Sequence, residues 1–208
     1  MPVAFPSHQG LILPVWARWP RHFNGLALCV GAAAPDIVDG LAWPLRGKLG
    51  QWLGHSLFGL FVLCVPVGLV VFYLLRQLGE RTRWHWLWSW LLVLDKPEDS
   101  SSVARTQLVL CSSLLLGAAS HIFFDFITHD TFVLLLPWYW SDQFFPAWWS
   151  QRWTSVELFV YDEPYPIGVH FVGWLLLSVI GAIVYVRIVK RARAEAQSAA
   201  EPPHVAAE

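Results

Sequence analysis

This sequence contains few charged residues. Only 14% of its 208 residues are Asp, Glu, Lys or Arg, against about 25% in an average soluble domain. Hydrophobic residues make up 56% of the chain, and one soluble core of this size cannot bury so much apolar surface. The composition therefore excludes an ordinary water-soluble domain and makes lipid the natural solvent.

Several functional signals are also missing. The net charge of -1 lacks the basic field that nucleic-acid binding needs, so no nucleic-acid partner is expected. Cys29, Cys64 and Cys111 lie inside apolar runs without the paired spacing of a metal site, which is typical of buried small hydrophobes. No Ser-His-Asp string or phosphate-binding loop supports another chemistry.

Long apolar segments are what the sequence does contain. A helix needs about 20 apolar residues to cross a bilayer core. Four segments reach or approach this length, namely Phe23–Trp43, His55–Leu75, Gln107–Ile127 and Ile167–Ile188. The sequence predicts an all-α, multi-pass transmembrane bundle, with about four to six membrane-embedded helices.

Tryptophan is used heavily in two further stretches, Trp84–Leu94 and Thr131–Trp153. Trp rings favour the headgroup level, so we expect Trp-rich helices or segments along the membrane interface. Residues 1–193 then form one integral membrane domain. Residues 194–208 are rich in Ala, Glu and Pro and are expected to be a disordered cytoplasmic tail.

The positions of Lys and Arg predict the orientation. In a four-span arrangement, eleven of the fourteen fall on one side, in the second connection, in the C-terminal tail and before the first span. Because basic residues concentrate on the cytoplasmic side, we expect a cytoplasmic C-terminus.

Ionisable residues from separate segments then converge at one level near the outer side. An Asp inside a membrane costs about 2.5–3.5 kcal/mol on insertion scales, so a group of them indicates a functional site. Asp39 lies close to the group but could point elsewhere. The others are Asp36, His55, His121, Asp125, His129 and His170.

The sharpest local pattern is His121, Asp125 and His129, because residues four apart share one helical face. Imidazole nitrogens and carboxylate oxygens suit zinc, iron or manganese. The alternative is that polar residues at a helix end only bond each other. His55 and Asp36 could likewise just start or cap helices.

His8 raises a question of topology. A first span that crosses fully would leave it in the cytoplasm, far from the other residues. Alternatively, Ser7 caps a helix to about Trp19 and a second helix returns from about His22 to Pro35. Each arm is then about 14 residues, or about 21 Å, long. The hairpin is favoured because it returns His8 to the level of Asp36, and it places the N-terminus outside.

Four motifs resemble those of a bacterial integral membrane family catalogued as a domain of unknown function. They are Ser7-His8, Ala34-Pro35-Asp36, the string from Gly54-His55-Ser56 to Phe61, and Ser120-His121 through Asp125 to Thr128-His129. The resemblance covers about Pro2 to Gly173. Where the family tends to show Gln-His-Gly-Ser, this chain has Val169-His170-Phe171-Val172, so His170 is a looser candidate.

The order of these residues is distantly similar to that of bacterial membrane-bound metal-dependent hydrolases and of the zinc phospholipase C and nuclease group. The similarity implies metal binding by His8, Asp36, His55, His121, Asp125 and His129. It implies catalytic roles for Asp36 and Asp125, either of which could bridge two metals. The later His and Glu of the soluble enzymes have no clear match, and His170 with Glu157 or Glu163 is only a loose one.

We therefore expect a divalent-metal hydrolase, with zinc ahead of iron or manganese, in the bacterial inner membrane. Its natural substrate would be a lipid or other phosphoester, because the site lies near the headgroups. A transporter or proton relay is an alternative, although no internal repeat is visible. The other alternative is a non-enzymatic membrane scaffold. A metal site requires the His and Asp residues within ligand reach, a relay strings them across the bilayer, and a scaffold scatters them. The oligomeric state stays open.

Overall fold

The computed structural model describes residues 4–42, 44, 53–81, 90–95, 102–128, 134, 148–149, 151–156 and 165–200. Its N-terminal helices are α1 (Ala4–Arg18), α2 (Gly25–Gly31) and α3 (Ala34–Ala42). A continuous helical segment follows, made of α4 (Leu57–Gly59), the π-helical turn η2 (Leu60–Cys64) and α5 (Val65–Arg81). The remaining elements are α7 (Val103–Thr128), β1 (Arg152–Val156), β2 (Tyr165–Gly168) and α8 (Val169–Ala200).

Within the described part of the chain, four helical segments are long and apolar enough to cross a membrane. They are Gly25–Ala42, Leu57–Gly79, Val103–Thr128 and Val169–Ala199. Each overlaps one of the four segments predicted from the sequence, so the all-α membrane bundle is confirmed. Side chains cap two of the starts, since Asn24 accepts a hydrogen bond from the Ala27 amide and Ser56 accepts one from the Gly59 amide. Such caps satisfy amide groups that a helix start leaves open.

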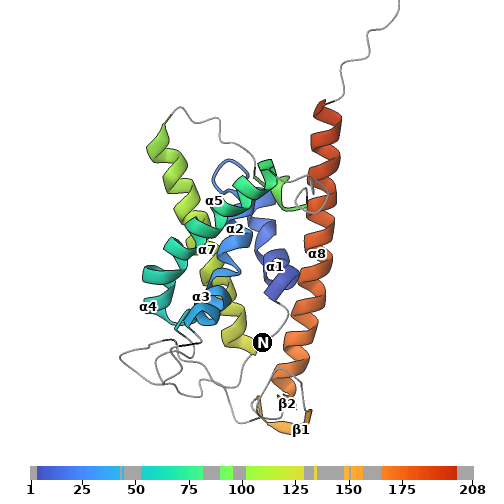
Figure 1. Cartoon of the computed structure of the whole chain (residues 1–208). Helices are drawn as coiled ribbons and strands as arrows, with labels where there is room; N and C mark the ends of the chain where they lie inside the picture. Colours follow the sequence, from blue (N-terminus) through green and yellow to red (C-terminus); the bar gives the residue numbers. More distant parts are fainter. Residues whose placement is uncertain are drawn as a thin grey trace, which may run out of the picture.

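The N-terminal segment is a helical hairpin, as Figure 1 shows. Helical backbone geometry is interrupted at Phe5 and Pro6, so the regular helix starts at Ser7, where the sequence predicted it. The chain turns after Arg18 and returns through α2. The returning arm breaks at residues 32–33 before α3 begins, so it is shorter than the predicted arm that ends at Pro35.

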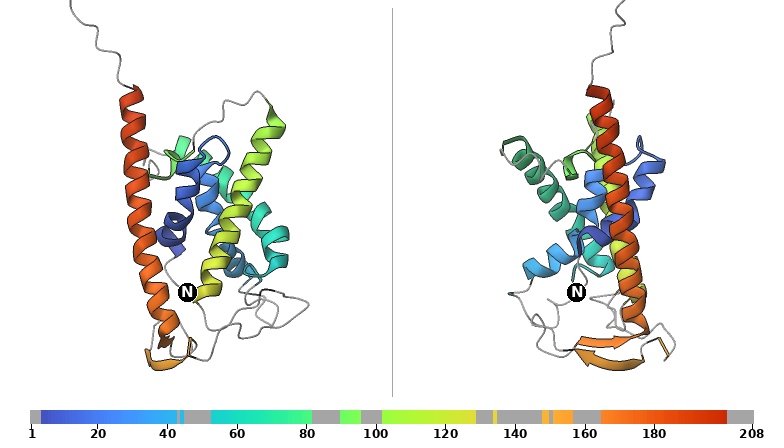
Figure 2. Two further views of the ribbon diagram at one scale, coloured as in Figure 1. Left: turned by 180° about the vertical axis from the view of Figure 1, so that it is seen from behind. Right: turned by 90° about the vertical axis from the view of Figure 1, so that its right-hand side faces the viewer.

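Glycines bring α2 and α7 into close contact. A Cβ atom on Gly31 would collide with the backbone of Leu114, and one on Gly117 would collide with the Leu28 carbonyl. Such small residues let helix backbones approach closely where lipid gives no hydrophobic drive. The approach places the Ala32 carbonyl beside α7, which matters for the site. On the other side of the hairpin, α8 packs along α1 (Figure 2).

A small antiparallel hairpin of β1 and β2 precedes α8, which the sequence analysis did not predict. The interfacial stretch Thr131–Trp153 is mostly outside the described residues, but its last two residues begin β1 instead of continuing a helix. Pairing with β2 gives hydrogen-bond partners to the backbone groups of this Trp- and Val-containing strand. An unpaired strand in lipid would leave these groups without partners. Of the stretch Trp84–Leu94, residues 90–92 are helical and 84–89 are not described.

The boundary predicted at residue 194 also differs from the structure, because α8 continues to Ala200. Ala and Glu are good helix formers, and Arg191 pairs with Glu195 one turn later at 3.0 Å. Local propensity therefore extends the helix past the apolar part. Residues 201–208 lie outside the described residues.

Candidate metal centre

Five ionisable side chains from four separate segments meet inside the bundle. His8 comes from α1, Asp36 from α3, His55 from the turn before α4, and His121 with Asp125 from α7. The side chains of the three His residues and Asp125 are at most 7% exposed, whereas the Asp36 side chain is 17% exposed. We call these five residues the His/Asp cluster, and Asp36 lies on its most open side.

Local structure explains how the members reach one another. His121 and Asp125 are one turn apart on α7, and Nε2 of His121 lies 3.2 Å from Oδ2 of Asp125, as their spacing predicted. His55 is set by Gly54, whose missing Cβ lets it sit against the Pro35 backbone. The Gly54 amide donates a hydrogen bond to Asp39. The turn before α4 is thereby held against α3.

The ligand atoms surround a common point. Nε2 of His55 and Nε2 of His121 lie 3.1 Å apart. Oδ2 of Asp125 is 3.1 Å from Nε2 of His55. Oδ1 of Asp36 lies 3.6 Å from Nε2 of His55 and 3.7 Å from Nε2 of His121. Four ligand atoms from three segments therefore face one small volume.

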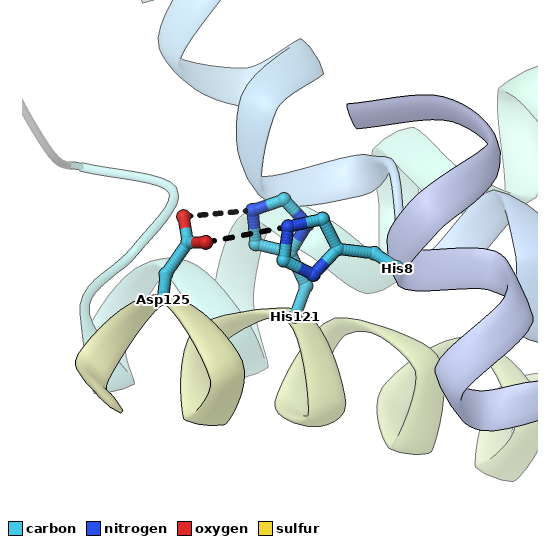
Figure 3. A group of neighbouring side chains, drawn as sticks. All are labelled: His8, His121 and Asp125. Carbon is cyan, nitrogen blue, oxygen red and sulfur yellow. Dashed lines mark ion pairs between the residues drawn. The ribbon is translucent and has the colours of Figure 1, made fainter. Parts of the chain in front are cut away.

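His8 joins from α1, where it faces His121 and Asp125 (Figure 3). Its ring stacks on the His121 ring with centroids 4.0 Å apart, and its Nε2 lies 3.3 Å from Oδ1 of Asp125. The two oxygens of Asp125 thus face different partners. This carboxylate has the geometry of a bridge between two neighbouring positions.

In the rings of His121 and His55, the hydrogen bond at Nδ1 determines whether Nε2, which faces the cluster, carries a hydrogen. Nδ1 of His121 lies 2.7 Å from the Ala32 carbonyl oxygen, which can only accept, so Nδ1 carries the hydrogen. Nδ1 of His55 lies 2.7 Å from Oδ2 of Asp39, and a carboxylate also accepts. When both rings are neutral, their Nε2 atoms present bare lone pairs to each other, and only a cation or an added proton between them removes the repulsion.

Such outer contacts are the ones that orient metal-binding histidines. Among the described residues, two groups could hold an ion, with all ligand atoms of each group within 4.8 Å of one another. One is His8, His121 and Asp125, and the other is Asp36, His55 and His121. Nitrogen and carboxylate oxygen suit zinc, iron or manganese, so the donor set fits the metals expected from the sequence.

Of the other predicted site residues, His170 does not join this cluster. His170 is buried at the start of α8 and belongs to neither group of ligand atoms among the described residues. His129, Glu157 and Glu163 lie outside the described residues. Sequence reasoning left Asp39 undecided, and the structure places it on the outer nitrogen of His55. The Ala32 carbonyl was missed because a backbone atom leaves no signal in the sequence.

Comparison with known proteins gives a family match. The sequence model of a family described as Domain of unknown function (DUF4184) matches residues 1–195, which confirms the resemblance to a family of unknown function. No curated protein and no solved structure matches the chain. The distant similarity to metal-dependent hydrolases stays a prediction.

Proposed function

Since the chain belongs to the family of this domain of unknown function, we propose its activity from the chemistry of the His/Asp cluster: a membrane-bound hydrolase of phosphate esters that depends on a divalent metal. The observation that carries the proposal is the pair of Nε2 atoms 3.1 Å apart. In each ring, Nδ1 donates a hydrogen bond to an acceptor that orients the ring, and carboxylates lie near both Nε2 atoms. Zinc is the first choice because it readily combines nitrogen and oxygen ligands, with iron or manganese as alternatives.

A bound divalent metal lowers the pKa of a water ligand to about 7 and so supplies hydroxide at neutral pH. The protein residues have the other roles in the proposed reaction. His8, His55, His121 and Asp125 would hold the metal, with Asp36 also within ligand reach. Asp36, the most exposed member of the cluster, faces the side from which water and substrate arrive.

In the proposed reaction, the oxygen of water forms a bond to phosphorus and the bond from phosphorus to the ester oxygen breaks. Asp36 accepts the proton that the attacking water gives up. The leaving ester oxygen takes this proton back from Asp36 and departs as an alcohol. Water and a phosphate ester thereby give an alcohol and a phosphate, with no other reactant.

The position of the cluster supports an outward-facing site. Figure 1 shows the end of α7 that carries His121 and Asp125 on the side of the N-terminus and the β-hairpin. The C-terminal end of α8 lies at the opposite end of the bundle and carries the basic residues Arg187, Lys190, Arg191 and Arg193. With a cytoplasmic C-terminus, the cluster faces the outer side of the membrane, which we propose is a bacterial inner membrane.

The compactness of the cluster favours a metal centre over the two alternatives. A proton relay needs ionisable groups spaced across the bilayer, whereas these five share one volume. In a scaffold, polar contacts between helices contribute only about 0.6 kcal/mol on average. That gain is small against the cost of gathering three carboxylates, counting Asp39, in one buried place.

Elemental analysis of the detergent-purified protein tests the proposal. We expect about one to two equivalents of zinc, iron or manganese, lost in the His121→Ala, Asp125→Ala double variant. A His22→Ala variant is the control, because His22 lies in the turn after α1 and outside both groups of ligand atoms. Phosphate release from p-nitrophenyl phosphate is then followed with the metal-loaded protein. No bound metal after incubation with each ion would contradict the proposal.

A further inference from the structure

A small cavity lies between α1, α7 and α8, next to the His/Asp cluster. Its volume is about 10 Å³, and a cavity of roughly 10–15 Å³ holds one water molecule. The polar residues of its lining include Ser7 and His8 from α1 and Trp174 and Ser178 from α8. Since His8 also contacts Asp125, the cavity adjoins the cluster directly.

Two nitrogen atoms of the lining residues are buried without a partner. Nδ1 of His8 and Nε1 of Trp174 have no hydrogen-bond partner within the described part of the chain. The His8 side chain is only 7% exposed, so bulk water does not reach it freely. Buried polar atoms in native proteins nearly always have a partner. The two nitrogens therefore indicate a molecule that binds in the cavity.

His8 differs in this respect from the other two histidines of the cluster. Nδ1 of His121 donates a hydrogen bond to the Ala32 carbonyl, and Nδ1 of His55 donates one to Asp39. Both acceptors belong to the protein itself. Among the described residues no such partner faces Nδ1 of His8, so this ring needs a partner from outside the chain.

The chemistry of the lining selects water among small ligands. The indole nitrogen of Trp174 is only a donor, so it offers no lone pair to a metal ion. An anion could accept this hydrogen bond, but the ionised carboxylates of Asp36 and Asp125 would repel it at short range. Water carries no charge, and the lining supplies the two to four polar partners that a buried water needs.

We propose that one water molecule binds in this cavity, accepts a hydrogen bond from Nε1 of Trp174 and is the hydrogen-bond partner of Nδ1 of His8. Because water both donates and accepts, it fits either neutral form of the imidazole. When Nε2 of His8 donates to Asp125, the water donates to Nδ1. When the lone pair of Nε2 faces a metal ion, Nδ1 donates to the water.

The water also connects α8 to the metal centre. None of the five cluster residues belongs to α8, yet the water joins His8 on α1 to Trp174 on α8. Partners of this kind typically change the metal affinity of a histidine site about 10- to 100-fold. The water site is independent of the proposed function, whereas its role in orienting His8 as a metal ligand rests on that function.

A high-resolution crystal structure of the full-length, metal-free protein, grown in a lipid mesophase, tests the water site. We expect one density peak of the size of water within hydrogen-bond distance of Nδ1 of His8 and Nε1 of Trp174. In the NMR spectrum of the zinc-loaded protein, the Nδ1 hydrogen of His8 should receive magnetisation from water. An anion at this position, or no density beside the two nitrogens, would overturn the proposal.

A pair of valine variants tests the effect on His8. Ser178→Val replaces a hydroxyl group of the lining by two methyl groups. It should expel the water, shift the ¹⁵N resonance of Nδ1 of His8 and lower the zinc affinity about 10- to 100-fold. Ser112→Val is the control, because the Ser112 hydroxyl bonds the Val109 carbonyl and does not line the cavity. Equal zinc affinity of the two variants, with the water lost from only one, contradicts the orienting role.

The water site and the proposed function fail separately. A water peak in a protein that binds no metal leaves the water site standing and sinks the metal-dependent hydrolase. Metal binding and phosphate release without the water peak leave the hydrolase standing and sink the water site.

Discussion

At the residue scale, one imidazole lies between two carboxylates of the same short helix. Asp36 and Asp39 are three residues apart on α3 and lie on neighbouring parts of its surface. Asp36 lies near Nε2 of His55, and Asp39 accepts a hydrogen bond from Nδ1 of the same ring. The pair therefore fixes both the position and the tautomer of the ring, so Asp39 is a positioning residue for a proposed ligand.

The Asp39→Asn change tests this role. Asparagine keeps the shape but has a single acceptor oxygen, so it cannot accept hydrogen bonds from both the Gly54 amide and Nδ1 of His55 as Asp39 does, and it removes the negative charge beside His55. We expect the affinity for zinc to fall about 10- to 100-fold, as for other partners of metal-binding histidines, measured by competition with a chromophoric chelator. Thermal unfolding of the metal-free variant serves as the control. An unchanged zinc affinity would show that Asp39 only holds the turn at Gly54.

At the element scale, close contact between α2 and α7 builds one wall of the cluster. A Cβ on Gly117 would collide with the Leu28 carbonyl and lie 2.8 Å from the Ala32 nitrogen. Ala32 is also the residue whose carbonyl orients His121. The distance between these two backbones thus determines where His121 points.

Adding one carbon at Gly117 should break this arrangement. Although alanine favours helix over glycine by about 0.5–1 kcal/mol, we expect Gly117→Ala to destabilise the protein by about 1–3 kcal/mol and to weaken zinc binding. Thermal unfolding and zinc titration measure the two effects. Gly40→Ala is the matched control, because a Cβ there meets nothing within 4 Å. Equal stability of both variants would contradict this account.

At the scale of the whole molecule, the cluster ties together four segments that no disulfide joins among the described residues, since Cys29, Cys64 and Cys111 are free. An ion bound there would hold α1, α3, α7 and the turn before α4 in one native arrangement. A ligand that binds only the folded state stabilises it, by about 4 kcal/mol at 1,000 times its Kd.

Metal removal should therefore lower the thermal stability. We expect treatment with EDTA to reduce the melting temperature of the wild-type protein by several degrees, and added zinc to restore it. Differential scanning fluorimetry in detergent measures the shift. The His121→Ala, Asp125→Ala double variant should melt at the same temperature under both conditions. A similar response of the double variant would place the stabilising metal elsewhere.

The sequence by itself determined the membrane spans, because apolar segments of this length have no stable place in water, and it determined that His121 and Asp125 share a face, because helical periodicity is local. The helical hairpin that returns His8 to the cluster was also foreseen, as one of two topologies. The β-hairpin was not, because its strands are defined by mutual pairing. Only the tertiary structure decided that Asp39 and the Ala32 carbonyl orient the two central histidines. Those features depend on distances between segments far apart in the chain, and such distances arise from backbone packing at Gly31, Gly54 and Gly117.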